Sequence, residues 1–480
     1  MPYFPVRQPL LKLGIFLLLI SIMVSCSFFG DRKKGQYIPI TFDLKTEIGS
    51  FGGLGANVPL SFYSRRMKVL QTFNELGIKY IRVKREAENW DNILAIRSAT
   101  SRLGVKWIYS LDDIPPSFLN DYGQLVDIQG FATWWAEEVD ELLYQDVPAD
   151  YIELLDRPDV ARKDSIPFTA DVYNDLIHAT RAELDLRDFK EVELIGPGLS
   201  RPDLSGDRET WFMYLDQDAF STLSYWTVQM WEDKADQASF GVPLSRLMDY
   251  LKRTESEKPI FVTAYASSKS SFNGVQYPDP DEYDALGNQD TYETYYYSAT
   301  FTMPYALQVY SNTLDLLKQK SVVPFLYQIY DAPADVKYNK KSWGLLDLNG
   351  GAKPVFTLLA NLMKRVPRNA SIIAAQPMND DQLDGLVFSD RSTVVVTMLN
   401  ESDMPKSVQI NLEGAGHPLE LATAISCYTT ALFTPDLGKR DNVIIEDLEL
   451  KLRYDGKRDA NIFSVTLKPQ STFVCEVKVK

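Results

Sequence analysis

Histidine and cysteine, which build many catalytic and metal sites, are scarce in this sequence. Histidine occurs only as His178 and His417, and cysteine only as Cys26, Cys427 and Cys475. A histidine-based catalytic triad and a zinc site both need these residue types in suitable arrangements, and the sequence offers no zinc-like spacing. We therefore expect no metal and no cofactor. Cys427 and Cys475 either pair in an oxidising compartment or remain buried thiols.

Positive charge is also in short supply. The 50 lysine and arginine residues do not balance the 65 aspartate and glutamate residues, so the net charge is −15. An acidic chain repels phosphate backbones, and we expect no nucleic-acid partner. The chain has 480 residues, of which 45% are hydrophobic. This is enough for a barrel of about 250–300 residues and a smaller domain.

A long apolar run is found only near the N-terminus, from Leu13 to Val24. Its length is typical of a signal peptide and short for a membrane span. The run leads into Met23-Val24-Ser25-Cys26, which resembles a bacterial lipobox. The alternative is an ordinary signal peptide with an accidental cysteine.

These features predict a bacterial lipoprotein. Residues 1–26 would be the signal peptide with its lipidated cysteine, and residues 27–36 a short tether. Ser27 follows the cysteine instead of aspartate, which is compatible with the outer membrane. Acyl chains would anchor the protein to this membrane without spanning it.

Strand-like and helical runs alternate between residues 51 and 368. Eight such units predict an α/β protein with a closed (β/α)8 barrel. Residues 369–480 instead contain short β segments separated by turns, which predict an antiparallel β-sandwich. A strand within residues 37–50 precedes the barrel, and we expect it to join the sandwich.

Several motifs occur in a recognisable order. They are Ile81-Arg82-Val83, Ile114-Pro-Pro-Ser-Phe-Leu119, Ile195-Gly-Pro-Gly-Leu199 and Trp343-Gly-Leu-Leu-Asp-Leu-Asn-Gly350. Together they resemble the retaining glycoside hydrolases of clan A, most closely families 30 and 39. The resemblance covers about residues 37–480 and implies a β/α barrel with a side β-sandwich. It also implies a catalytic glutamate at the ends of the fourth and seventh barrel strands.

Both expected glutamates are missing. Asp156-Arg157-Pro158 stands where the family has Asn-Glu-Pro with the acid/base, and Thr263-Ala264-Tyr265 stands where a Thr-Glu-Tyr-like motif carries the nucleophile. Trp226 stands near the histidine that the family often has on strand six. Retaining cleavage needs two carboxyl groups about 5–5.5 Å apart. Arginine stays protonated and alanine offers no nucleophile, so we expect no catalytic residue at Arg157 or Ala264.

Other residues could still give these strand ends a function. Arg157 could donate to the carboxylate of a uronic acid, or pair internally with Asp156, Asp159 or Glu153. Asp156 and Asp331 are candidate substitutes for the missing carboxylates. Asp112, Asp113, Asp203 and Glu232 also lie near the strand ends, where two carboxylates with a wider gap could act as an inverting pair; the alternative is that these acidic residues cap helices. Strand alternation is expected to turn Asp156 away from Arg157.

Substrate binding is predicted for polar and aromatic residues near the strand ends. The residues are Arg82, Asp113, Asp156, Arg157, Tyr225, Trp226, Tyr265 and Tyr330. Trp231 and Tyr327 also lie at or after strand ends. Sugar rings stack on such aromatic faces, and we expect about half of these aromatic residues to line a cleft.

Three functions remain open from the sequence. The first is a lipoprotein that binds an oligo- or polysaccharide through a degenerate glycosidase cleft. The second is an active glycoside hydrolase with relocated carboxylates. The third is a scaffold component of a polysaccharide uptake or export system. The replaced glutamates favour the first over the second.

Overall fold

The computed structural model describes residues 37–479 with internal gaps. The residues left out within this range are 60–65, 86–89, 161–167, 203, 205–206, 233–240, 268–270, 273–274, 277–297, 332–341, 377–379 and 430–440. The predicted signal peptide, Cys26 and the tether lie outside the described residues. Across the part of the chain that is described, no helix is long and apolar enough to cross a membrane.

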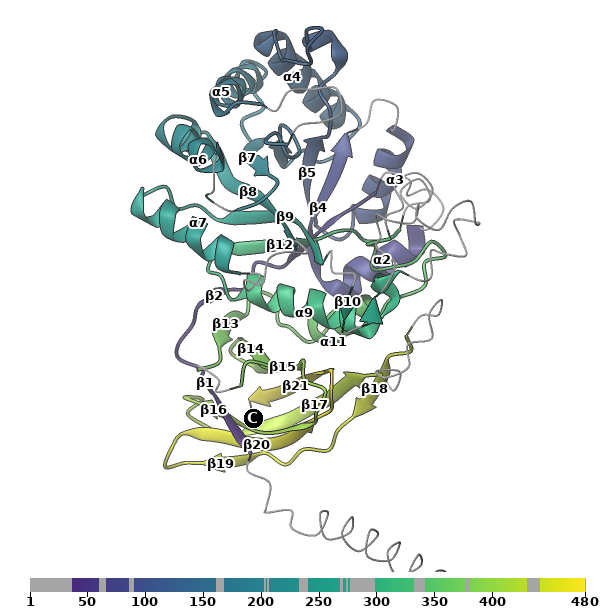
Figure 1. The fold of residues 1–480 in the computed structure, drawn as a ribbon, viewed down its shortest axis with the longest axis vertical. Helices are drawn as coiled ribbons and strands as arrows, with labels where there is room; N and C mark the ends of the chain where they lie inside the picture. The colour runs from purple at the N-terminus through teal and green to yellow at the C-terminus, as the bar shows by residue number, and fades with distance from the viewer. Residues whose placement is uncertain are drawn as a thin grey trace, which may run out of the picture.

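A closed parallel barrel of eight strands confirms the predicted fold class (Figure 1). Its strands in chain order are β3 (Leu54–Asn57), β4 (Ile78–Arg85), β5 (Lys106–Leu111), β6 (Tyr151–Glu153), β7 (Glu193–Leu199), β8 (Leu223–Glu232), β9 (Ile260–Ser267) and β12 (Val322–Leu326). β12 pairs with both β9 and β3, which closes the barrel. A short hairpin of β10 (Ser271–Phe272) and β11 (Val275–Gln276) follows β9.

Helices surround the barrel. The described helices are α2 (Arg66–Leu76), α3 (Trp90–Thr100), α4 (Ile128–Tyr144), α5 (Ala170–Leu186), α6 (Asp207–Gln217), α7 (Val242–Arg253), α9 (Met303–Leu317) and α11 (Pro354–Met363). Several begin with a residue suited to a helix start. In α4 the carboxylate of Asp127 accepts from the N–H of Gly130, and in α9 the hydroxyl of Thr302 accepts from Tyr305.

Two strand boundaries differ from the expectation in a way that matters for the site. The sequence pattern predicts the sixth barrel strand over Phe220–Trp226, but β8 continues to Glu232, six residues further. The fourth strand, β6, ends at Glu153, before the motif that contains Arg157. Both differences move the strand ends, where barrel enzymes build their sites, relative to the residues that the sequence suggested.

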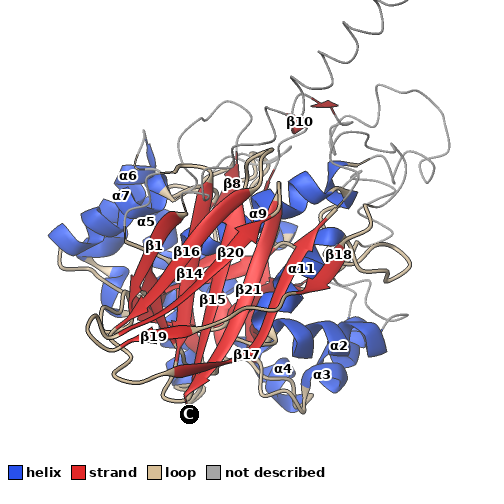
Figure 2. Ribbon diagram, turned by 90° about the horizontal axis from the view of Figure 1, so that it is seen from below, coloured by secondary structure: helices blue, strands red, loops and turns tan. Residues whose placement is uncertain are grey.

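The C-terminal β-sandwich is also confirmed (Figure 2). One sheet contains β1 (Ile38–Asp43), β16 (Lys406–Glu413), β20 (Ala460–Leu467) and β19 (Arg453–Asp455). The other contains β18 (Ile444–Asp447), β17 (Leu419–Tyr428), β21 (Ser471–Val479), β15 (Thr393–Asn400), β14 (Leu383–Ser389), β13 (Ser371–Ala374) and β2 (Gly49–Ser50). β1 pairs with β16 in parallel, so the first sheet is not wholly antiparallel. Cys427 and Cys475 are buried free thiols.

Helix α9 joins the barrel to the sandwich (Figure 1). The Tyr310 hydroxyl lies 2.5 Å from that of Thr397 on β15, and the Lys318 ammonium donates to Asp384 on β14 at 2.6 Å. Buried apolar side chains from both domains, such as Leu314 and Phe388, belong to one continuous cluster. The two domains therefore share part of their hydrophobic core.

Aromatic rings fill the inside of the barrel near the start of its strands. Phe261 stacks on Tyr225 with ring centroids 4.1 Å apart, and lies 5.1 Å from Tyr80 and 5.3 Å from Phe325. Gly55 leaves room for this cluster, because a Cβ there would lie 2.3 Å from the Phe325 ring. The lower barrel is thus a packed core, and a ligand site must lie above it.

Replacing Phe261 with alanine tests the importance of this core. Phe261 is fully buried, so we expect Phe261→Ala to lower the free energy of unfolding by about 3–5 kcal/mol. Urea denaturation followed by circular dichroism measures the change. Tyr122→Ala is the control, because that side chain is 76% exposed. Equal stability of the two variants would contradict the packing of Phe261 against Tyr80, Tyr225 and Phe325.

Candidate functional site

A small pocket lies at the carboxyl ends of the barrel strands, and we call it the central pocket. Its volume is about 160 Å³. The residues that line it are Arg82, Lys84, Asp156, Arg157, Gln229, Trp231, Tyr327 and Trp343. Three of the predicted binding residues, Arg82, Asp156 and Arg157, therefore meet here.

A fully buried arginine forms the floor of the central pocket. Arg82 donates through Nε to Glu153 at 2.7 Å and through Nη2 to Asp156 at 2.7 Å. The same guanidinium also donates to Asn57 at 3.2 Å and Ser110 at 2.9 Å. The ion pairs with Glu153 and Asp156 are almost entirely shielded from solvent. Such a buried charge is tolerated only when it is paired and hydrogen-bonded.

The backbone of Asp156 and Arg157 is held by the neighbouring strands. The N–H of Asp156 donates to the carbonyl of Leu111 at 2.8 Å, and that of Arg157 to the carbonyl of Gly198 at 3.0 Å. Arg157 has φ = +50°, a left-handed conformation that costs a non-glycine residue about 1–2 kcal/mol. The expectation that strand alternation separates Asp156 from Arg157 was wrong, because β6 has already ended and the Nε of Arg157 lies 3.2 Å from Asp156.

Asp156 accepts hydrogen bonds from several cationic and polar side chains. It accepts from Lys84 at 3.0 Å, from Gln229, and from the two arginines already described. Burial opposes its ionisation, but the charges of Lys84, Arg82 and Arg157 outweigh burial and hold the pKa of Asp156 well below its ordinary value. Asp156 therefore stays ionised at neutral pH and cannot donate a proton.

The charged side chains around Arg82 differ in their exposure to solvent. The side chains of Lys84 and Arg157 are 24% and 40% exposed, whereas those of Glu153 and Asp156 are 0% and 1% exposed. Lys84 also pairs with Asp112 at 2.7 Å on the rim. The exposed charges among the residues that line the central pocket are thus cationic, whereas the rim residue Asp112, whose side chain is 37% exposed, is anionic.

Three aromatic rings line the central pocket. The centroid of Trp231 lies 4.9 Å from those of Tyr327 and Trp343, and Tyr327 lies 5.8 Å from Trp343. The indole N–H of Trp231 donates to Gln229 at 2.9 Å, and Gln229 in turn donates to Asp156. The rings and the charged cluster are therefore one connected structure.

The structure places Tyr225 and Trp226 away from the pocket. Tyr225 belongs to the aromatic cluster inside the lower barrel. Trp226 is fully buried on the helix-facing side, where its indole N–H donates to the carbonyl of Ser256 at 3.0 Å. Because β8 runs on past Trp226, the residues that reach the pocket from this strand are Gln229 and Trp231. Trp226 therefore does not line the central pocket as predicted.

Tyr265 and Tyr330 are also 1% exposed and outside the pocket lining. The Tyr265 hydroxyl lies 2.7 Å from that of Thr313 on α9, and the Tyr330 hydroxyl donates to the carbonyl of Pro59 at 3.2 Å. Their partners are thus within the fold. Of the six aromatic residues considered from the sequence, Trp231 and Tyr327 line the central pocket.

Ala264, at the expected nucleophile position, and Asp331, a candidate substitute, do not line the central pocket. Ala264 is buried on β9, where it pairs in register with Gln229. Asp331 is fully buried, forms an ion pair with Lys353 at 2.6 Å, and does not line the pocket. Asp156 is the one carboxylate among the described residues that line the central pocket. Asp156 and Asp331 therefore do not share this pocket as a pair.

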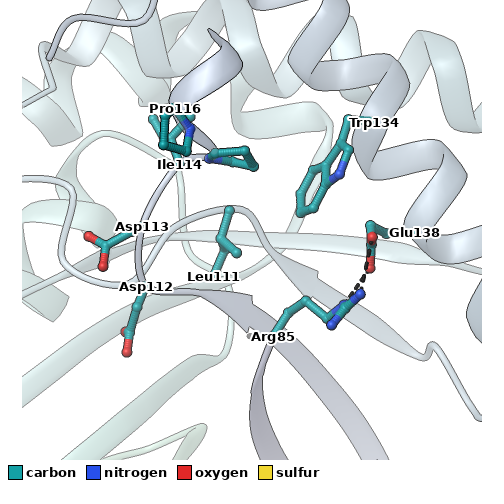
Figure 3. Close-up of a pocket in the computed structure, with 9 residues that line it drawn as sticks. Arg85, Leu111, Asp112, Asp113, Ile114, Pro116, Trp134 and Glu138 are labelled. Carbon is teal, nitrogen blue, oxygen red and sulfur yellow. Dashed lines mark hydrogen bonds and ion pairs between the residues drawn. The ribbon is translucent and has the colours of Figure 1, made fainter. Parts of the chain in front are cut away.

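Asp113 lies in a second cavity of about 510 Å³, the lateral pocket (Figure 3). This pocket lies between the ends of β4 and β5 and helix α4. Arg85, Leu111, Asp112, Asp113, Ile114, Pro115, Pro116, Trp134 and Glu138 line it. The Lys84–Asp112 ion pair connects the two pockets, because Lys84 lines one and Asp112 the other.

Metal ligands are not grouped in the described part of the chain, where no cluster of three or more histidine, cysteine, aspartate or glutamate side chains could hold an ion. The chemistry that the central pocket offers is that of fixed donors, an ionised carboxylate and aromatic faces. This combination suits the binding of a polar ring with a negative group.

Sequence reasoning missed Lys84, Gln229 and Trp343 as pocket residues. Lys84 could have been found, because a residue two positions after Arg82 on a strand points to the same face. Gln229 needed the correct end of the sixth strand. Trp343 follows the last barrel strand at a distance that no periodicity predicts.

The comparisons with known proteins support the architecture. No protein-family model and no curated protein matches the chain. Among solved structures, a family 30 subfamily 8 xylanase from Clostridium acetobutylicum has a TM-score of 0.64 at 12% identity, covering 92% of this chain and 100% of its own. An endo-β-1,6-glucanase has a TM-score of 0.60 at 11% identity, with 93% and 95% covered. A family 39 enzyme from Xanthomonas axonopodis pv. citri has a TM-score of 0.57 at 10% identity, with 94% and 99% covered.

The chain therefore has the fold of the clan A glycoside hydrolases of families 30 and 39, as the sequence motifs indicated. Identities of 10–12% support a shared fold and leave the activity to be argued from the site.

Asp156→Asn tests the charge cluster. The variant leaves Lys84 and Arg82 short of a negative partner, so we expect it to lower the free energy of unfolding by about 3–5 kcal/mol at pH 7. The pKa of Asp156 is lower in the folded state than its ordinary value of 3.8. Its ionisation therefore stabilises the fold at neutral pH and loses this effect as the pH falls below that value.

The difference between wild type and Asp156→Asn should consequently narrow below about pH 4. Urea denaturation at several pH values measures it. The control is Asp121→Asn, because Asp121 is an exposed carboxylate. A constant difference across this pH range would argue against the ion pairs of Asp156.

Proposed function

We propose that this protein is a carbohydrate-binding pseudoenzyme, and that its central pocket recognises an acidic sugar. The observation that carries the proposal is the exposure of charge in the pocket. Lys84 and Arg157 face solvent, while the carboxylates of Glu153 and Asp156 are withdrawn into ion pairs. A uronic acid carboxylate would find cationic donors there.

The aromatic rings support a sugar as the carrier of that negative group. Trp231, Tyr327 and Trp343 offer apolar faces beside polar atoms, an arrangement that suits a pyranose ring. A volume of about 160 Å³ is below the roughly 300 Å³ at which most ligand pockets begin. The pocket therefore suits one sugar residue. The fold, shared with xylanases and glucanases, is consistent with a carbohydrate ligand.

Hydrolysis is disfavoured by the same cluster. A retaining or inverting mechanism needs one carboxyl group that donates a proton and a second that attacks or activates water. Asp156 is held ionised, Asp331 is buried against Lys353, and Arg157 and Ala264 supply neither group. Relocated catalysis by Asp156 and Asp331 would require both to reach one sugar.

We further propose that a lipid on Cys26 anchors the protein to the outer membrane, as the lipobox-like sequence suggests. A scaffold role in polysaccharide uptake or export remains the alternative function, and it needs no ligand in the central pocket. Binding measurements separate it from the proposed one.

The absence of hydrolysis can be tested directly. We expect no turnover of aryl glycosides or of plant and bacterial polysaccharides, because the pocket lacks a proton donor. Release of nitrophenol and of reducing sugar measures this, with a family 30 xylanase as the positive control. Turnover by the wild type that is lost in Asp156→Ala or Asp331→Ala would establish relocated catalysis and end the pseudoenzyme proposal.

Binding of acidic sugars is the second test. We expect uronate oligosaccharides to bind weakly and without calcium, and Arg157→Gln to weaken binding about 10-fold or more, because a charge-assisted hydrogen bond contributes about 1.5–3 kcal/mol. Titration calorimetry measures the affinity with and without a chelator. Arg391→Gln, at an exposed position in the sandwich, is the matched control.

Two results would count against the acidic-sugar site. If Arg157→Gln and Arg391→Gln bind uronates equally well, the cations of the central pocket are not the recognition element. If no acidic oligosaccharide binds at all, the scaffold function becomes the better account.

A further inference from the structure

The lateral pocket is a second cavity beside the central pocket, and its lining has a different chemistry. It lies between β5 and α4, where Leu111 of β5 and Trp134 and Glu138 of α4 line it. Figure 3 shows the side chains of Trp134 and Glu138 projecting from α4 towards the segment Asp112–Pro116. Its volume of about 510 Å³ falls within the range of about 300–1,000 Å³ that holds small ligands.

The walls of the lateral pocket are apolar and partly flat. Ile114 and Pro116 lie across from the half-buried indole of Trp134 (Figure 3), and Pro115 also lines the pocket. The indole is held in place by Phe131, whose ring stacks on it at 5.6 Å with an interplanar angle of 16°. A fixed aromatic ring facing apolar side chains is suited to the C–H face of a sugar ring.

The floor of the lateral pocket provides both donors and acceptors. Nε of Arg85 donates to Glu138 at 2.5 Å, and Nη2 lies 3.4 Å from the other carboxylate oxygen. The two charges cancel, and the side chains are only 7% and 16% exposed. Paired charges of this kind can hydrogen-bond to neighbouring hydroxyl groups without favouring a charged ligand.

A buried tyrosine hydroxyl lies near Arg85 and Glu138. The side chain of Tyr109 lies two residues before Leu111 on β5 and is fully buried. Among the described residues its hydroxyl has no hydrogen-bond partner. It is near enough to Arg85 and Glu138 for both charges to affect its pKa, which burial raises. Tyr109 does not line the lateral pocket, so its hydroxyl lies behind the floor and would need a water molecule to satisfy it.

From these features we propose that the lateral pocket binds an uncharged pyranose residue and is a second carbohydrate site. The ring would lie between Trp134 and the prolines, and its hydroxyls would bond to Arg85 and Glu138. The Lys84–Asp112 ion pair stands between this site and the central pocket, so a glycan that contains both a neutral and an acidic residue could occupy both. The lateral site does not rest on the proposed function of the central pocket.

Titration calorimetry of the full-length protein with neutral and acidic oligosaccharides tests the proposal. The neutral probes are xylo-, gluco- and galacto-oligosaccharides, and the acidic probe is a uronate oligosaccharide. We expect at least one neutral probe to bind, with Trp134→Ala weakening it about 10-fold or more and Glu138→Gln weakening it several-fold. Trp134→Phe should retain most of the affinity, because it keeps an aromatic face, and unchanged uronate binding by Trp134→Ala shows that this variant is folded.

Tyr144→Ala is the matched control, because Tyr144 lies on the same helix and is 83% exposed. Arg157→Gln should lower uronate affinity and leave neutral binding as in the wild type, so the two sites fail independently. The proposal is overturned if no neutral oligosaccharide binds, or if Trp134→Ala and Tyr144→Ala bind the neutral probe alike. A glucosamine oligomer is added as a cationic probe, and binding of that probe alone would also overturn the proposal, because the carboxylates of Asp112 and Asp113 would then be the recognition element.

Discussion

The mouth of the barrel is organised around one buried guanidinium. Arg82 on β4 bonds to Asn57 on β3, Ser110 on β5, and Glu153 at the end of β6. It also bonds to Asp156, in the segment that follows β6. A charge in this position cannot be hydrated, so it requires negative and polar partners with good geometry. These partners come from successive strands, and their positions are therefore fixed relative to one another.

This arrangement has a direct consequence for function. The carboxylates that could have done chemistry near the strand ends are committed to cations: Glu153 and Asp156 to Arg82, and Asp331 to Lys353. Their pairing leaves Lys84 and Arg157 as the charges at the pocket surface. A retaining glycosidase instead exposes two carboxyl groups in its site, because an acid and a nucleophile must face the sugar. The central pocket thus lies at the strand ends, where barrel enzymes build their sites, and its exposed charges are those of Lys84 and Arg157.

Much of the fold could be predicted from residue patterns. The alternation of strands and helices gave the barrel, and the change to short β segments after residue 369 gave the sandwich, because these patterns are local and periodic. The residues of the central pocket were harder to predict. A motif identified Asp156 and Arg157. Tyr225 and Trp226 were predicted to bind substrate because the sixth strand was expected to end at Trp226, whereas β8 ends six residues later, at Glu232. Trp226 instead faces the helices and bonds to Ser256.

The sequence by itself determined the class of fold and the cationic character of Arg157, because these depend on residue identity and order along the chain. Only the tertiary structure decided which residues share a pocket. Lys84, Gln229 and Trp343 come from separate parts of the chain and meet through barrel closure. The structure also decided which charges are exposed, since that depends on how side chains from three neighbouring strands and the segment after β6 pack around Arg82, and no local pattern encodes such packing.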